Sequence, residues 1–146
     1  MSNLYKLDSD IEYYNTFWLA DCYYKLNDYQ YSIELYNSLS LKSPSKSLYY
    51  NNLREYNLAY AYFKKGEHEA ANKHFKNYEK VVSDTMRLND TYLRIADCFF
   101  MNQKYSLANT YYQRAIKCGL FDVDYAIYKS SQCLNLLQSY LSLIHI

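Results

Sequence analysis

The sequence predicts an all-α fold assembled from short pairs of helices. Its 146 residues include only two Gly and one Pro, which leaves few positions for tight hairpin turns, whereas helix interiors need neither residue. The segment from Leu19 to Tyr36, LADCYYKLNDYQYSIELY, is also echoed by the segment from Ile95 to Tyr112, IADCFFMNQKYSLANTYY. Because the echo keeps the order of side-chain sizes while most letters change, the chain is expected to repeat one packing unit.

Composition limits both the size of the fold and its partners. A chain of 146 residues can bury one core of reasonable size, so a single domain or a single array is expected. Sixteen Lys and Arg nearly balance 15 Asp and Glu, so bulk charge gives no sign of a phosphate-binding surface, and no nucleic-acid partner is expected. No apolar run reaches the roughly 20 residues that span a bilayer, and the first residues lack the pattern of a secretory signal. Direct insertion of this segment into a membrane is therefore not expected.

Three copies of the repeated unit share one set of intervals. In each copy the intervals are counted from a small residue, here called the anchor, and an aromatic residue follows the anchor three positions later, on the same helix face. Small or apolar residues then follow the anchor at intervals of 12, 16 and 19 residues. The three copies consist of Ala20, Tyr23, Ser32, Tyr36 and Leu39; Ala59, Tyr62, Ala71, Phe75 and Tyr78; and Ala96, Phe99, Ala108, Tyr112 and Ala115.

Each copy is predicted to be a helix, a tight turn and a second helix. The turns read KLND, KKGE and NQK. Capping patterns predict helix starts at Ser9, which has Glu12 three residues later, and at Asp28. A small anchor lets the second helix approach the first closely, and the aromatic residue beside it fills the remaining space.

The spacing between copies is less regular than the spacing within them. The anchors are 39, 37 and 35 residues apart when Ser131 is taken as the fourth anchor, and Leu134 then holds the aromatic position. The extra residues are expected to lie between repeats, at 40–47 and 81–90, where a connection can lengthen without disturbing the packed layers.

Small and aromatic residues at these spacings, within about 34 residues, resemble the tetratricopeptide repeat. The first copy also has that family's closing proline, Pro44, and the second has Gly66, whereas Thr16, Glu55 and Tyr92 stand where the family often has Trp or Leu. The resemblance implies a right-handed α-solenoid of antiparallel helix-turn-helix repeats, three of them complete, followed by the first helix of a fourth. The array is expected to cover residues 1–140, with repeats at about 13–44, 52–83, 89–118 and 124–140.

No catalytic, metal or cofactor site is expected. His68 and His74 are six residues apart, a spacing that turns them to different helix faces, and no Gly-rich phosphate loop or nucleophile elbow is present. Cys22, Cys98 and Cys133 each follow an anchor by two residues, which predicts buried structural thiols. Cys118 lies outside that pattern and is the one candidate for a reactive thiol. An enzyme would need catalytic groups outside this sequence.

The resemblance also implies a binding surface. In the family, first helices line a concave face, and residues one turn to either side of the anchor point into the groove. Carried onto this chain, the candidate groove residues are Tyr14, Phe17, Asp21 and Tyr24 in the first copy, Leu53, Tyr56, Tyr60 and Phe63 in the second, Leu93, Asp97 and Phe100 in the third, and Tyr125, Tyr128 and Gln132 in the fourth.

Two interpretations of this aromatic face remain open. One is a noncatalytic scaffold that holds an extended or helical peptide by aromatic contacts, with Asp21 and Asp97 selecting a basic or amide-bearing ligand. The other is that the rings pack neighbouring layers, so that the repeats are a structural spacer. Family members that grip the C-terminal carboxylate of chaperones use Lys, Asn and Arg in the groove. Because Phe17 and Asp21 stand at two of those positions, a chaperone cofactor is not expected.

The stretches YNLAYAYFKKGEHEAANKHF, NDTYLRIADCFF and DVDYAIYKSSQCL resemble the repeats of long bacterial tandem-repeat proteins, which are often proteins of the cell envelope. That resemblance implies an internal fragment of a larger assembly scaffold, with further repeats of its own parent chain as neighbours and a periplasmic or envelope location; without it, a cytoplasmic repeat domain is expected. The last six residues, LSLIHI at 141–146, resemble the translation of a sequencing-library adapter. They are expected to be non-native, with a natural apolar tail as the alternative.

Overall fold

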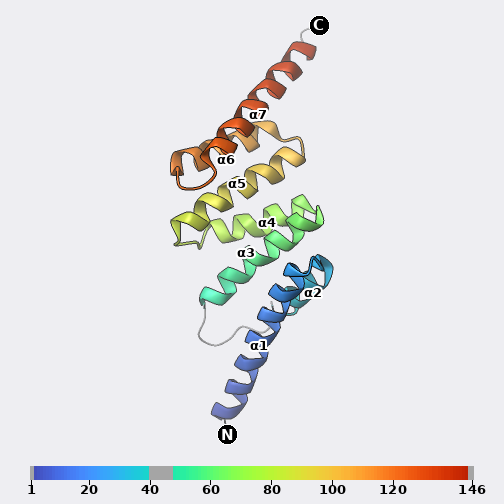
Figure 1. The fold of residues 1–146 in the computed structure, drawn as a ribbon, viewed down its shortest axis with the longest axis vertical. Helices are drawn as coiled ribbons and strands as arrows, with labels where there is room; N and C mark the ends of the chain where they lie inside the picture. The colour runs from blue at the N-terminus through green and yellow to red at the C-terminus, as the bar shows by residue number, and fades with distance from the viewer. Residues whose placement is uncertain (1, 40–47, 145–146) are drawn as a thin grey trace. The chain divides into compact units, whose positions relative to one another are not determined.

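The computed structural model describes residues 2–39 and 48–144, which contain seven helices and no strand (Figure 1). The predicted all-α class is therefore confirmed. The chain divides into two compact units, residues 1–67 and residues 68–146. The helices of unit 1 are α1 (Ser2–Lys25), α2 (Tyr29–Ser38) and α3 (Leu48–Lys65). Those of unit 2 are α4 (His68–Glu79), α5 (Thr85–Met101), α6 (Tyr105–Cys118) and α7 (Val123–Ile144).

Unit 1 is a helical hairpin, α1 and α2, with α3 packed mainly on α2. The chain turns at Asn27, whose φ of 64° lies in the left-handed region that Asn tolerates. Asp28 then caps α2, because its carboxylate accepts a hydrogen bond from the backbone N–H of Tyr31 at 3.1 Å. The expected helix start at Asp28 is confirmed. The core of the unit consists of Tyr13, Phe17, Ala20, Ile33, Tyr36, Leu39, Leu58 and Ala61.

A hydrogen bond between α1 and α2 explains the small residues of the first copy. Ala20 and Ser32 are both fully buried, and the Ser32 hydroxyl donates to the backbone carbonyl of Ala20 at 2.8 Å. A side chain of one helix can bond the backbone of the other only where neither position carries a large group. The size order of the repeat is thus a requirement of this close crossing.

Unit 2 stacks its four helices in chain order, each packed on the next. Asp84 caps α5 by accepting a hydrogen bond from the N–H of Met86 at 2.9 Å. Gly119, at a φ of 69°, ends α6 in the left-handed conformation that suits a residue without Cβ. Buried Asn89 then holds the α6–α7 connection: its side chain accepts from the N–H of Leu120 at 2.9 Å and donates to the carbonyl of Phe121 at 3.3 Å.

The structure corrects the predicted start of the first helix. No helix begins at Ser9, because α1 runs without interruption from Ser2, and the Ser9 hydroxyl donates to the carbonyl of Lys6 at 3.0 Å. Inside a helix, Ser followed three residues later by Glu is a common surface pattern, so the capping-box spacing does not by itself mark a start. The first of the two expected long connections, which contains Pro44, falls at residues 40–47. These lie outside the described residues.

The predicted register of the fourth copy is wrong by one residue. Ser131 and Leu134 are exposed, whereas the buried residues of α7 are Ala126, Ser130 and Cys133. The buried Ser130 hydroxyl donates to the side-chain oxygen of Asn109 at 2.6 Å and accepts from Gln113 at 2.8 Å. Ser130 lies 34 residues after Ala96, so it, and not Ser131, is the small residue that packs against α6.

The prediction that Cys22, Cys98 and Cys133 are all buried is confirmed for two of them and wrong for the third. Cys98 and Cys133 are buried, but Cys22 is exposed. Burial raises the pKa of the Cys98 thiol to about 12, so this group stays protonated. Cys22 differs because the face of α1 two residues beyond Ala20 has no helix covering it in unit 1.

Candidate functional site

A pocket of about 190 Å³ lies in unit 1, among all three of its helices. It is lined by Asp21 and Tyr24 of α1, Tyr36 of α2, and Tyr56, Asn57 and Tyr60 of α3. Four of these six residues, Asp21, Tyr24, Tyr56 and Tyr60, belong to the groove set that the sequence predicts.

Helical spacing explains how these side chains meet. Asp21 and Tyr24 are three residues apart on α1, and Tyr56 and Tyr60 are four apart on α3, so each pair lies on one helix face. The rings of Tyr56 and Tyr60 make an edge contact with their centroids 5.0 Å apart. Such a contact fixes both rings against each other and against α3.

Tyr36 lines the pocket from α2, and its hydroxyl has a defined partner. The side-chain amide of Asn57 donates to the Tyr36 oxygen at 3.0 Å. Burial raises the pKa of Tyr36 well above its ordinary value, the Asn57 hydrogen bond opposes that rise, and the negative charge of Asp21 adds to it. The phenol is therefore neutral at physiological pH, and it can still donate its own proton.

Among the described residues that line the pocket, Asp21 is the one with a charged side chain. It pairs with Lys25, one turn further along α1, at 2.7 Å. The side chain of Lys25 is 71% exposed, whereas that of Asp21 is 21% exposed. The hydrogen bond to Asp21, together with the charge of Asp21, raises the pKa of Lys25. In this pair the carboxylate of Asp21 is mostly buried, whereas the ammonium group of Lys25 lies on the solvent-exposed side.

The remaining groove candidates of unit 1 do not line the pocket. Phe17 is fully buried in the core, where its ring makes edge contacts with Tyr36 and Tyr50. Tyr14 packs on Tyr50 at 4.8 Å between ring centroids, and Leu53 packs against the same core. Phe63 is half-buried on α3. The assignment of Phe17 to a binding surface is therefore corrected, because its position faces α2 within the hairpin.

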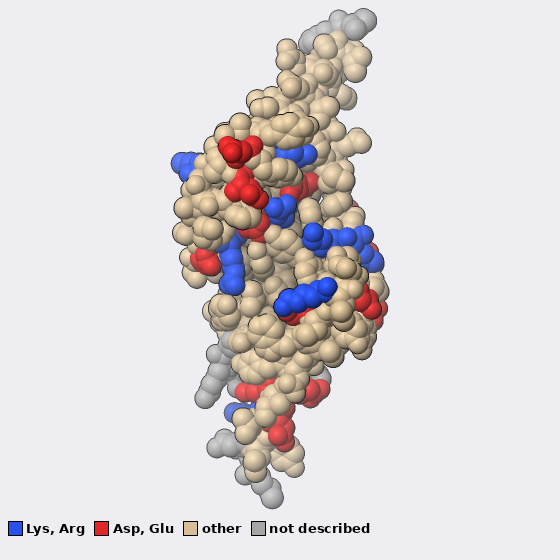
Figure 2. Space-filling model, in the orientation of Figure 1, with Lys and Arg blue, Asp and Glu red and all other residues tan. Residues whose placement is uncertain are grey.

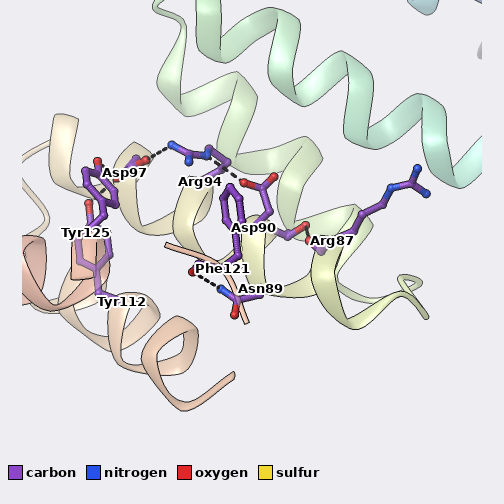
Figure 3. A network of polar contacts seen from close by, with 9 residues as sticks. Arg87, Asn89, Asp90, Arg94, Asp97, Tyr112, Phe121 and Tyr125 are labelled. Carbon is purple, nitrogen blue, oxygen red and sulfur yellow. Dashed lines mark hydrogen bonds and ion pairs between the residues drawn. The ribbon is translucent and has the colours of Figure 1, made fainter. Parts of the chain in front are cut away.

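Asp97, the second acidic point of the predicted groove, lies inside unit 2 (Figure 3). Its side chain is 7% exposed. One carboxylate oxygen accepts hydrogen bonds from the hydroxyls of Tyr112, at 2.6 Å, and Tyr125, at 2.8 Å, and the other pairs with Arg94 at 2.6 Å. Arg94 also pairs with Asp90 at 3.3 Å. Asp97 therefore joins α5, α6 and α7, and the expectation that it selects a ligand is corrected.

The two tyrosines of this network are held in their neutral form. Burial, and then the adjacent charge of Asp97, raises the pKa of both Tyr112 and Tyr125. Both phenols thus remain hydrogen-bond donors to the carboxylate. A buried carboxylate with two neutral donors and one guanidinium is fully paired, so its arrangement is that of a structural connection between helices.

The other candidates in unit 2 are divided between core and surface. Leu93 is buried and Phe100 is half-buried, with the ammonium of Lys129 3.4 Å from its ring centroid. Tyr128 is exposed, and its hydroxyl accepts from Gln132 at 2.8 Å. These candidates come from α5 and α7, and none of them lines the second pocket, which lies in unit 2 and has a volume of about 500 Å³. That pocket is formed by Gln103, Lys104, Tyr105, Ser106, Leu107, Leu137 and Tyr140. The ring of Phe100 makes an edge contact with that of Tyr105 at 5.4 Å between centroids.

Sequence reasoning missed Tyr36 and Asn57 as pocket residues. The repeat spacing predicts that Tyr36 belongs to the packing layer of the first copy, which is correct for its ring but says nothing of its hydroxyl. A buried tyrosine hydroxyl needs a polar partner, so a polar residue in the next first helix was the available signal. Asn57, two residues before the anchor Ala59, fits that requirement.

Other kinds of site find little support in the part of the chain that the structure describes. No group of three or more His, Cys, Asp and Glu side chains is arranged there to hold a metal ion. Among the described helices, none is long and apolar enough to cross a bilayer. On the face shown in Figure 2, basic and acidic side chains are interspersed.

Comparisons with known proteins agree with the helical fold. The family model described as tetratricopeptide repeat matches residues 15–45 and 90–117. The crystal structure of the Sgt2 TPR domain from Aspergillus fumigatus is similar, with a TM-score of 0.67 and 17% sequence identity, over 90% of this chain and 82% of that one. No curated protein sequence matches. The chain therefore contains tetratricopeptide repeats at residues 15–45 and 90–117, and its fold is an α-solenoid of helix-turn-helix repeats.

Proposed function

We propose that this protein is a noncatalytic interaction scaffold that holds a peptide segment of a partner protein against its first helices. Tetratricopeptide repeat domains generally mediate protein–protein interactions. The observation that carries the proposal is the unit 1 pocket, in which five of the six lining residues come from the first helices α1 and α3 and the sixth, Tyr36, comes from α2.

The chemistry of the pocket suits protein recognition. Tyr24, Tyr56 and Tyr60 are each half-buried, so each presents part of its ring while the rest packs against the protein. Half-buried tyrosines are rigid, and they give a partner large contact area at a small entropic cost. Interfaces accordingly gather much of their binding energy on such aromatic anchors.

The test is the affinity of a partner for a pocket variant. Partners are captured on the immobilised full chain, identified by mass spectrometry, and measured by isothermal titration calorimetry. Tyr60→Ala removes one wall of the pocket and is expected to weaken binding by about tenfold or more, as truncation of an interface anchor does. Tyr31→Ala is the matched control, because Tyr31 is an exposed tyrosine on α2 that does not line the pocket.

Equal affinities for wild type, Tyr60→Ala and Tyr31→Ala would contradict the proposal, provided that circular dichroism shows each variant folded. The alternative function, a structural spacer that positions other domains of a longer envelope-assembly protein, predicts that outcome. One observation favours the spacer: Phe17 and Asp97, two of the expected groove residues, are used inside the protein. Under that alternative, Tyr60→Ala lowers the melting temperature and changes no binding.

A further inference from the structure

We infer that the unit 1 pocket takes a cationic side chain, Lys or Arg, from the partner peptide. This inference rests on the proposed function, since it names the chemistry of the residue that the pocket receives. It comes from three observations: the composition of the walls, the intramolecular pairing of Asp21, and the size of the pocket.

The pocket attracts a cation through two kinds of interaction, one with aromatic ring faces and one with a carboxylate. The lining residues include three half-buried tyrosines, Tyr24, Tyr56 and Tyr60, together with Asp21, whereas the ring of Tyr36 is fully buried. The face of a tyrosine ring carries negative electrostatic potential and attracts a cation within about 6 Å of its centroid. A carboxylate attracts the same cation by charge and hydrogen bonding. Among the described residues, no Lys, Arg or His lines the pocket.

Other side chains fit these walls poorly. An acidic side chain would meet both the Asp21 carboxylate and the negative faces of the rings. An aliphatic side chain would fill the space but would shield Asp21 from water without supplying a compensating bond, which is unfavourable. An ammonium or guanidinium group contacts the rings and pairs with Asp21 at once, and its alkyl stem covers apolar ring surface.

The protein already shows that Asp21 holds an ammonium group. Lys25 pairs with it at 2.7 Å from the exposed side. A side chain that is 71% exposed is free to leave toward solvent, because an exposed i, i+4 ion pair is weak. Lys25 therefore acts as an internal competitor for the carboxylate, and an incoming cation displaces it.

The size of the pocket points to a single side chain. Its volume of about 190 Å³ is below the roughly 300–1,000 Å³ of sites that enclose drug-sized ligands. A Lys or Arg side chain on an otherwise surface-bound peptide matches a site of this size. Asn57 adds one polar group beside the charge, which suits the several N–H donors of either cation.

The experiment is an NMR titration of the isotope-labelled full chain with capped pentapeptides of alanine whose central residue is Lys, Arg, norleucine or Glu. Each peptide is added to millimolar concentration. The expected result is saturable shift changes of the Asn57 side-chain amide and of the Tyr60 and Asp21 backbone amides with the Lys and Arg peptides. The Lys and Arg arms decide which cation is preferred. Norleucine binding as well as Lys would overturn the inference, and so would the absence of shifts with all four peptides.

Two variants with opposite expected effects separate binding from a loss of structure. Asp21→Asn removes the charge and is expected to weaken binding of the Lys peptide by at least several-fold. Lys25→Gln removes the competitor and is expected to strengthen it by about two- to fivefold, in line with the small strength of exposed pairs. Lys65→Gln is the matched control, because Lys65 pairs with Glu67 and is not among the pocket residues.

These outcomes are distinguishable from failure of the proposed function. If a captured partner loses affinity with Tyr60→Ala but not with Asp21→Asn, the scaffold function holds and the cationic specificity is wrong. If Lys25→Gln weakens binding, or acts as Lys65→Gln does, the competitor role is wrong. If the Lys peptide binds the pocket while no partner depends on Tyr60, the pocket chemistry holds and the scaffold function fails.

Discussion

At the scale of residues, tyrosine supplies both the core and the candidate binding surface. The ring of Tyr36 is part of the unit 1 core, and that of Tyr112 is buried in unit 2, yet each hydroxyl has a polar partner, Asn57 and Asp97 respectively. Tyr60, at a different place in the repeat, keeps part of its ring at the pocket. The partner of the hydroxyl, together with the burial of the ring, decides which tyrosines are structural.

A first prediction at this scale concerns Asp97. Asp97→Ala leaves Arg94 with one fewer carboxylate and leaves the hydroxyls of Tyr112 and Tyr125 without their acceptor. The free energy of unfolding is expected to fall by about 3–5 kcal/mol, because the guanidinium and the two hydroxyls lose their hydrogen-bond acceptor in a buried site. Urea denaturation followed by circular dichroism measures the loss.

The control for Asp97 is Asp124→Ala, which removes an exposed carboxylate from the first turn of α7. It is expected to cost less than about 1 kcal/mol, as changes near an exposed helix end do. An Asp97→Ala variant as stable as Asp124→Ala would show that the network contributes nothing to the fold.

At the scale of elements, close crossings between helices determine which residues must be small. In the α1–α2 hairpin the crossing is marked by the bond from Ser32 to the Ala20 carbonyl. In unit 2, Ser130 of α7 meets Asn109 and Gln113 of α6. Both sites combine a buried small residue with a satisfied hydroxyl, so a larger side chain there loses a hydrogen bond and also overpacks.

A prediction at this scale tests the register of α7. Ser130→Leu is expected to lower the free energy of unfolding by about 1–3 kcal/mol, because it overpacks the contact with α6. Ser131→Leu, one residue further on an exposed position, is expected to change it by less than about 0.5 kcal/mol. Thermal and urea denaturation of the two variants compares them directly. The reverse order would restore the register that the sequence spacing favours.

The element scale also shows how far the sequence predicts the fold. The helix pairs, the cap at Asp28 and the buried anchors Ala20, Ala59 and Ala96 follow from local spacing alone. The register of α7 does not, because the fourth copy has no second helix in the sequence to fix its alignment. The start of α1 also fails, since Ser9 bonds within a helix that continues past it.

The candidate site is predictable only in part, for a reason that belongs to tertiary structure. Periodicity places Asp21, Tyr24, Tyr56 and Tyr60 on the faces of first helices, and these four do line the pocket. Periodicity gives the same status to Phe17 and Asp97, which are buried. Whether a residue on such a face is buried depends on the lengths and crossing angles of the neighbouring helices. The sequence of one helix does not specify these.

At the scale of the whole molecule, the two units use their first helices differently. In unit 1 the aromatic and acidic residues line a pocket. In unit 2 the carboxylate at the corresponding position, that of Asp97, is instead bonded to side chains of α5, α6 and α7. Repeats in a solenoid contact only their neighbours, so one repeat can specialise for binding while another specialises for stability. On this account partner recognition is concentrated in unit 1.

The most direct test of this account is site-specific photo-crosslinking of the full chain in an extract of its source cells. A benzophenone amino acid replaces Tyr60 in one variant and Tyr31 in another, and cross-linked products are identified by mass spectrometry. If unit 1 binds the partner, the probe at position 60 is expected to yield a discrete protein adduct that the probe at position 31 does not yield, and the attached peptide is expected to contain Lys or Arg. Adducts of equal yield and identity at the two positions, or none at Tyr60, would contradict it.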